Sequence, residues 1–212
     1  NEGYEFPMYF YDKNKINDIR YLISNDILKH SMTVIAYNLG ILTPAENTDL
    51  EYLNNWQSKY AFSEERVLED FKRITTNLYV TDTDNWDLLK KNIDNYLLKS
   101  IEENPCINFI LYYPPFTDLM PKYLYMRNEN DFNNFLKIRE YVFSKIQDLQ
   151  NVQIYDFQAS DEITGNYDYY KDLSHHSQEV NEWILDMIKE NKYLVTEDNI
   201  GEFLYNIKED AR

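Results

Sequence analysis

The sequence has very little cysteine and no long apolar run. With Cys106 as its one cysteine in 212 residues, the chain cannot hold an internal disulfide framework. We expect Cys106 to be buried, because Ile107, Phe109 and Ile110 beside it are apolar. No stretch approaches the roughly 18 apolar residues that would span a membrane, and no charged leader precedes an apolar segment. We therefore expect no direct insertion into a membrane.

Basic residues are also scarce relative to acidic ones. Lysine and arginine number 21 against 37 aspartates and glutamates, which gives a formal net charge of -16. A chain this acidic repels nucleic-acid backbones and anionic membranes over a Debye length of about 8 Å at physiological salt. Nucleic acid is therefore not expected as a partner.

The first hundred residues are typical of helices, after an aromatic segment over 1–12 that reads as an extended arm or edge strand. Ser63, Glu64 and Glu65 form an N-cap with an acidic first turn, and Gly40 is a typical helix stop. Apolar residues recur at helical spacing between such signals. We expect helices from about residue 16, from Ser24 to Gly40, from Ser63 to Leu78, and over about 85–103.

The pattern changes at 106–113, a continuous apolar run between Pro105 and Pro114 that predicts a short strand covered on both faces. A loose segment to Asn128 follows. Strand, helix, strand and helix in succession predict a right-handed βαβ crossover with parallel strands. The later elements are a helix over about 129–150, a strand over 152–157, a loop to Lys171, a helix capped near Ser177 and a last helix from Thr196.

Two of the three histidines, His175 and His176, follow Asp172 by three and four residues. An aspartate at this spacing can hold one imidazole nitrogen, so that the other takes a proton from a nucleophile. In the alternative interpretation Ser174 and Ser177 cap helices and the histidines are polar surface residues, because so short a motif also occurs by chance.

Topology favours the functional interpretation. Ligands of open parallel sheets bind at the carboxyl ends of the strands, and both the Tyr113–Pro114 loop and the Asp172–His175 loop follow a predicted strand. Asp172 and His175 are therefore the candidate catalytic residues. Tyr113, Pro114 and His176 are weaker candidates for binding.

Two strands are too few for a stable parallel sheet, which usually has about four to six. We therefore expect an α/β fold in which this chain is the carboxyl-terminal part of a doubly wound, flavodoxin-like parallel sheet with a largely helical amino-terminal region. The expected division is a helical lid or insertion over 1–80 and a βαβα half over 81–212. Because the chain starts at Asn1 rather than at methionine, we interpret it as a processed product or an excised piece.

The block from Tyr167 to Ser177, followed by Val180-Asn181-Glu182-Trp183-Ile184, resembles the last block of the SGNH hydrolases, the GDSL esterase and lipase superfamily. The strand over 109–115 resembles the one before that block, so the resemblance covers about 106–190. It is strongest to members found with bacterial cell-envelope polysaccharide or acyl-transfer genes, which implies an envelope location. It also implies that Asp172 orients His175, that His175 activates a serine, and that the substrate is an acylated glycan or similar ester, with no cofactor.

The serine block of that family has no counterpart here. None of the four glycines, at positions 3, 40, 165 and 201, adjoins a serine, and no Gly-x-Asn oxyanion motif is present. Nucleophile and oxyanion donors supply much of the rate in such enzymes. We therefore expect the Asp/His half of a serine esterase or O-acyltransferase, nearly inert alone.

The sequence is also compatible with two other functions. Twenty tyrosines suit a non-catalytic SGNH-like or helical module that binds glycan or a protein partner. A metal site is the other, with His175 and His176 joined by Asp168 or Asp172. Adjacent histidines tend to point apart and no second histidine or cysteine pair supports them, so we expect no metal.

Overall fold

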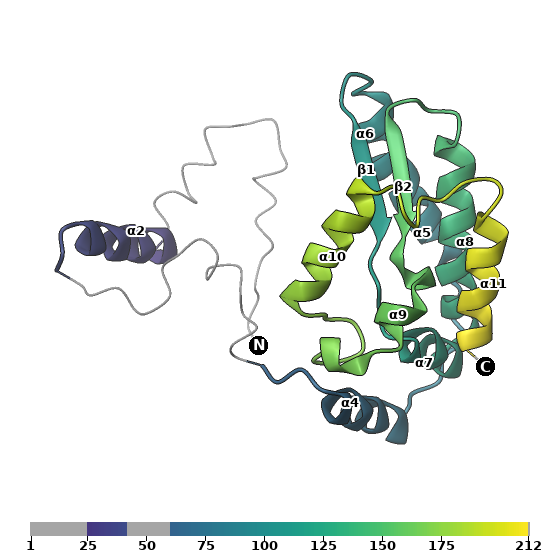
Figure 1. The fold of residues 1–212 in the computed structure, drawn as a ribbon, viewed down its shortest axis with the longest axis horizontal. Helices are drawn as coiled ribbons and strands as arrows, with labels where there is room; N and C mark the ends of the chain where they lie inside the picture. Colours follow the sequence, from purple (N-terminus) through teal and green to yellow (C-terminus); the bar gives the residue numbers. More distant parts are fainter. Residues whose placement is uncertain (1–24, 42–59, 212) are drawn as a thin grey trace. The chain divides into compact units, whose positions relative to one another are not determined.

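The computed structural model describes residues 25–41 and 60–211 of the chain, which divides into two compact units, Asn1–Asn55 and Trp56–Arg212. The expected arm over 1–12 and the helix expected from about residue 16 lie outside the described residues. In the first unit the described residues form α2 (Asn25–Asn38) and the turn after it (Figure 1). Gly40 has a φ of 68°, a left-handed conformation that glycine adopts without steric cost, so the predicted helix stop is confirmed.

The second unit contains a parallel pair of strands, as predicted. In β1 (Phe109–Tyr113) and β2 (Val152–Asp156), Phe109 lies opposite Val152 and Tyr113 opposite Asp156. The far edge of β2 is also covered, because Val195 donates its N–H to the carbonyl of Ile154 at 2.8 Å. The fold is thus of mixed α/β type and mostly helical in the described residues.

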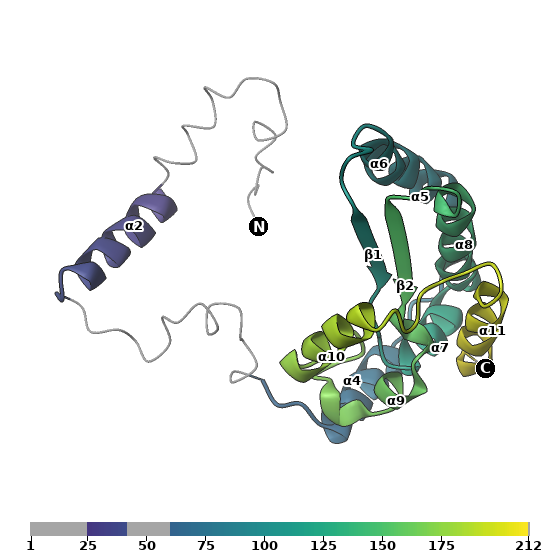
Figure 2. The ribbon, with the colours of Figure 1, turned by 45° about the horizontal axis from the view of Figure 1, so that its top comes forward.

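Helices cover the two faces of this pair unequally (Figures 1 and 2). On one face Ile154 packs with Val142 and Ile146 of α8 (Glu129–Ile146) and with Ile101 of α6 (Lys99–Glu102). On the other face the buried Tyr155 packs with Val180 and Ile184 of α10 (Gln178–Lys189). The strand β2 is therefore enclosed on both faces by helices that follow or precede it in the chain.

The prediction that the first strand is covered on both faces is wrong. Ile110 and Tyr112 on one face of β1 are 51% and 50% exposed. The reason is that α10 packs on β2, and on the Ile110 face of β1 the ring of Tyr112 meets Phe157 at 6.0 Å between centroids while Ile110 and Tyr112 each stay about half exposed. Cys106 is likewise exposed rather than buried, because it lies in the turn before β1.

The helices mostly follow their sequence signals, with three differences, one of which is a short helix, α9 (Asp161–Thr164), inside the loop expected to end at Lys171. The expected helix over 85–103 is present as α5 (Trp86–Asn92), a π-helical segment (Ile93–Leu98) and α6. The segment expected to be loose contains α7 (Leu119–Arg127). Pro121 does not prevent this helix because it lies in the first turn, where its missing N–H has no intrahelical acceptor. The remaining elements are 3-10 turns at Phe157–Ala159 and Tyr167–Tyr169, and α11 (Ile200–Asp210).

The helix α4 (Glu64–Thr76) belongs to the second unit, although the sequence predicts a division near residue 80. Two backbone hydrogen bonds hold its amino terminus: Ser63 donates to the carbonyl of Tyr170 at 3.2 Å, and Glu64 donates to Oδ1 of Asp168 at 3.0 Å. Val67 on the same helix is fully buried in the core cluster beneath α10. These contacts join α4 to residues that lie 104 positions later in the chain, in the case of Glu64 and Asp168.

One ion pair lies inside the core at the carboxyl end of β2. Arg139 of α8 and Asp156 approach to 2.6 Å, with side chains only 4% and 3% exposed. The guanidinium also lies 4.3 Å from the ring centre of Tyr113 and 4.0 Å from that of Phe135. Burial raises the pKa of Asp156, against the opposing effects of Arg139 and of the Gln158 N–H.

We expect the two serines that precede α4 and α10 to differ in their effect on stability. Ser63 accepts a hydrogen bond from the N–H of Arg66, whereas the Ser177 hydroxyl is buried with no partner among the described residues. Ser63→Ala should therefore lower the free energy of unfolding by about 1 kcal/mol, and Ser177→Ala should leave it unchanged or raise it. Urea unfolding followed by circular dichroism measures both; an equal loss in the two variants would contradict the assignment of the cap.

Removal of only one partner of the buried ion pair should strongly lower the free energy of unfolding. Arg139→Met leaves an uncompensated buried carboxylate and should destabilise the protein by about 3–5 kcal/mol. Adding Asp156→Asn removes that charge while keeping an acceptor for the Gln158 N–H, so the double variant should be more stable than Arg139→Met alone. Urea midpoints compare the three proteins, and a double variant less stable than the single one would show that the pair is not the source of the cost.

Candidate active site

The loop over residues 169–177 is closed by its own backbone. Tyr170 and His176 form an antiparallel bridge, Lys171 donates its N–H to the carbonyl of His175 at 3.1 Å, and Ser177 donates to that of Tyr169 at 2.8 Å. The residues between form a tight turn with Asp172 at its start. A small ordered loop of this kind holds the Asp172 and His175 side chains without a helix or strand of its own.

Buried hydrogen bonds attach this loop to the segment that follows β1. Thr117 donates both its N–H and its hydroxyl to the carbonyl of Leu173, at 3.0 and 3.1 Å. The hydroxyl of Tyr170 donates to the carbonyl of Pro115 at 3.0 Å. The loops that follow the two parallel strands therefore lie together, as expected from the sheet topology.

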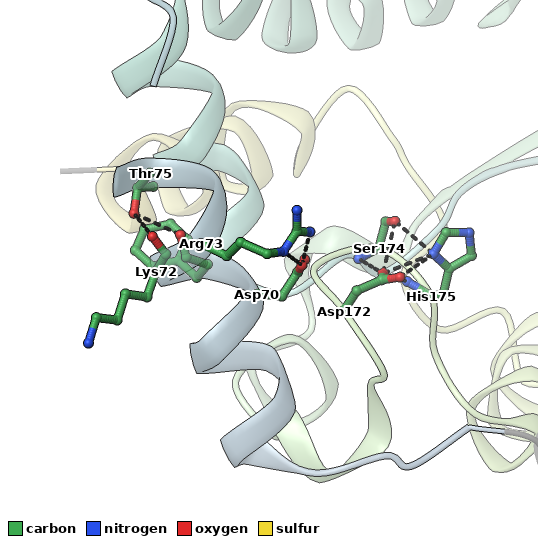
Figure 3. Close-up of polar contacts among 8 residues, drawn as sticks. Asp70, Lys72, Arg73, Thr75, Asp172, Ser174 and His175 are labelled. Carbon is green, nitrogen blue, oxygen red and sulfur yellow. Dashed lines mark hydrogen bonds and ion pairs between the residues drawn. The ribbon is translucent and has the colours of Figure 1, made fainter. Parts of the chain in front are cut away.

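Asp172 and His175 are in direct contact (Figure 3). Both carboxylate oxygens of Asp172 lie 2.8 Å from Nδ1 of His175. Oδ1 also accepts the N–H groups of Ser174 and His175, each at 2.9 Å. The carboxylate thus fixes the imidazole and closes the turn at the same time.

These contacts determine the charge of the carboxyl group. Partial burial raises the pKa of Asp172, but the hydrogen bonds from the Ser174 N–H and from the side chain and N–H of His175 together hold it below its ordinary value. Asp172 is therefore ionised at neutral pH. With the proton of a neutral imidazole on Nδ1, facing the carboxylate, Nε2 becomes the basic nitrogen that accepts a proton from a nucleophile.

The serines near this pair are not arranged as a nucleophile. The Ser174 hydroxyl lies 3.2 Å from Nδ1 of His175, the nitrogen that Asp172 already holds. Ser177 is buried. The described residues thus provide an orienting acid and a base, and the hydroxyl beside them faces the wrong nitrogen for a triad.

The two adjacent histidines lie in different environments. His176 is half-buried, its Nδ1 lies 3.3 Å from the carbonyl of Ser177, and its ring packs edge-on against Tyr170 with centroids 6.3 Å apart. Burial is the main cause of its lowered pKa, to which the nearby His175 also contributes. His176 is thus a neutral packing residue at pH 7, while His175 is 56% exposed at the surface.

The weaker candidates at the end of β1 lie in a different environment. Tyr113 packs against the guanidinium of Arg139 and donates a long hydrogen bond of 3.4 Å to the carbonyl of Ile138. Burial raises the pKa of its hydroxyl far above the ordinary value. Pro114 is half-buried beside it. The hydrogen bond and the cation–π contact of Tyr113 thus involve Ile138 and Arg139, which belong to α8 and not to the 169–177 loop.

No group of three or more histidine, cysteine, aspartate or glutamate side chains in the described ranges is arranged to hold a metal ion. Asp168, one of the ligands considered for such a site, instead accepts the N–H of Glu64 at the start of α4. Asp172 is held by its own turn and by His175.

The sequence interpretation missed the cations beside this pair. Arg66 and Arg73 of α4 and Lys171 line one hollow together with Asp172. The two arginines lie about two helical turns apart, so they share a face of the helix. That spacing was a usable signal, but nothing in the sequence placed this face of α4 against the 169–177 loop.

Comparison with known proteins adds no relative. No protein-family model matches the chain, and no curated protein or solved structure matches it. In the part of the chain that the structure describes, none of the helices combines the length and apolarity needed to cross a membrane.

We expect Asp172 to have two separable roles. Asp172→Asn keeps an acceptor for the two turn N–H groups but loses the charge, whereas Asp172→Ala loses both, so Ala should cost about 1 kcal/mol more. Because the pKa of the folded carboxyl is below 3.8, its charge stabilises the fold fully above pH 3.8 and less as the pH falls further. The difference between wild type and Asp172→Asn should therefore shrink in acid.

Unfolding followed from pH 7 to pH 3 tests this dependence. Imidazole nitrogen shifts in ¹⁵N NMR spectra provide a second readout, since the neutral His175 ring should carry its proton on Nδ1 in the wild type and lose that preference in Asp172→Asn. A wild-type ring protonated mainly on Nε2 would contradict the orienting role.

Proposed function

We propose that this chain is the Asp/His-bearing part of an SGNH-like serine esterase or O-acyltransferase that acts on an acylated glycan or similar ester of the bacterial cell envelope. The observation that carries the proposal is the contact of both Asp172 oxygens with Nδ1 of His175 at 2.8 Å. In this role His175 is the general base and then the general acid, and Asp172 orients it.

The location of the pair supports this assignment. A loop that follows one parallel strand and is hydrogen bonded to the loop after the other is where α/β enzymes hold their reacting groups. His175 is exposed at this position, so a substrate can reach the ring. The SGNH-like motif, whose aspartate and histidine match Asp172 and His175, agrees with the same reaction class.

The sheet supports the doubly wound fold that the function requires. Phe109 donates its N–H to Asn151 on the β2 side, so the backbone groups of the alternate residues Ile110 and Tyr112 point to the opposite edge of β1. The described residues place no strand at that edge. We propose that further parallel strands pair there, and that the serine and the oxyanion donors come from outside residues 1–212.

A non-catalytic module is the second candidate, and the tyrosines favour it. Tyr79, Tyr96 and Tyr205 are 81%, 75% and 62% exposed, and such rings can stack on sugars or pack against a protein. In this interpretation the Asp172–His175 contact only stabilises its turn. Ester turnover therefore separates the two functions.

The test compares turnover of an acetyl ester, such as p-nitrophenyl acetate, by this chain and by the natural polypeptide that contains it. The chain alone should show background turnover and no labelling by a fluorophosphonate. In the longer polypeptide His175→Ala should reduce kcat at least about a thousandfold, because the nucleophile loses its base. His176→Ala is the matched control and should change kcat less than about tenfold.

Unchanged turnover in His175→Ala would remove the catalytic assignment. A longer polypeptide that shows neither turnover nor labelling would favour the binding module instead.

A further inference from the structure

A hollow with a volume of about 400 Å³ lies beside the first half of β2, and this volume is within the range of ligand pockets. The end of α8, residues 152–154 of β2 and residues 194–197 line it. The last of these segments runs from β2 to α11 next to α8 (Figures 1 and 2). The walls of the hollow therefore come from distant parts of the chain, and they share no residue with the 169–177 loop.

The floor of this hollow is apolar. Ile146, Ile154 and Val195 are 3%, 5% and 9% exposed and belong to one core cluster. Phe143 and Val152 are half-buried against the same cluster, and they also line the hollow. An alkyl chain that lies on these side chains would lose its contact with water on one side, which stabilises binding roughly in proportion to the apolar area covered.

The charged groups of the lining are all of one sign. They are the carboxylates of Asp148 and Glu197, both on exposed residues, and the other polar side chains of the lining are uncharged. In residues 25–41 and 60–211, neither carboxylate takes part in an ion pair or a hydrogen bond. The lining thus carries two negative charges and no positive one, which makes it complementary to a cation at contact distance.

An open part of a strand edge also faces this hollow. The segment beside β2 bonds to it at two residues, because Val195 donates its N–H to the carbonyl of Ile154 at 2.8 Å and Asp156 donates to that of Tyr193 at 3.0 Å. Backbone groups of alternate residues point to the same edge, so those of Val152 face this edge too. In the described part of the chain, no backbone hydrogen bond at this edge involves Val152. The edge is therefore open at the residue that lines the hollow.

The turn that carries Glu197 is held in place by Asn199. The Asn199 side chain accepts the N–H of Thr196 at 2.8 Å and donates to the carbonyl of Leu194 at 2.8 Å. Glu197 lies between these anchored residues. Because the backbone on both sides of it is fixed, little ordering of the chain is needed when a ligand binds.

We propose that this hollow docks an extended segment of a partner polypeptide through a lysine or arginine side chain. The backbone of the segment pairs with β2 at Val152, as in strand addition to an open sheet edge. The alkyl stem of the basic side chain lies on the apolar floor, and its charged end reaches Asp148 and Glu197. The proposal does not depend on the function proposed above, since the hollow contains no residue of the candidate active site.

The experiment titrates this chain with the blocked peptide acetyl-Thr-Val-Lys-Val-Thr-amide and follows backbone amide shifts in ¹⁵N NMR spectra. We expect saturable shifts at Val152, Ile154 and Glu197, with a dissociation constant in roughly the millimolar range. The same peptide with norleucine in place of lysine keeps an alkyl stem without the charge and should bind at least about twofold more weakly. Butylammonium chloride keeps the charge and the stem without a backbone and should bind at least about tenfold more weakly.

Glu197→Gln should weaken binding of the lysine peptide about two- to fivefold, the range expected for an exposed ion pair, and should leave binding of the norleucine peptide unchanged. Asp198→Asn is the matched control, because it removes the same charge from the next residue, which lies outside the lining. Circular dichroism checks that both variants are folded.

Equal affinity of the lysine and norleucine peptides, or equal weakening in the two variants, would overturn the role of the carboxylates. Butylammonium that binds as tightly as the lysine peptide would overturn the polypeptide partner, because the strand edge would then contribute nothing.

Discussion

The position of the candidate active-site loop depends on the buried ion pair between Arg139 and Asp156, which lies outside the site. Asp156, at the end of β2, binds Arg139 and also accepts the N–H of Gln158 at 3.1 Å. The Gln158 amide in turn binds both the N–H and the carbonyl of Phe116, at 3.0 and 3.1 Å. The next residue, Thr117, holds the 169–177 loop. Each group in this chain of contacts is satisfied only when its neighbour is in place, which makes the loop rigid.

A positioning network of this kind explains how a loop can hold a reacting pair. The contacts that fix the turn are backbone hydrogen bonds to Asp172, whose carboxylate also meets the imidazole. The same group is thus a structural element and an orienting acid, and its lowered pKa follows from both roles. Stability and chemistry are coupled at this residue, so only variants that keep the turn can separate them.

Charged groups of both signs meet beside the Asp172–His175 pair. Arg66 and Arg73 on one face of α4 and Lys171 of the loop line one hollow together with Glu69, Asp70 and Asp172. The formal charges of this lining balance, although the chain as a whole carries a net charge of -16. The packing of α4 against the 169–177 loop is what brings these groups together.

Local chemistry along the chain determined much of this structure. The cap at Ser63, the stop at Gly40 and the contact of Asp172 with His175 follow from short-range signals, because caps, turns and an Asp-x-x-His spacing act over a few residues. The parallel strand pair follows from the order strand, helix, strand along the chain. Tertiary packing alone decided the rest. It exposed one face of β1, paired Arg139 with Asp156 and brought α4 to the loop, since these depend on which elements meet and not on their own sequence.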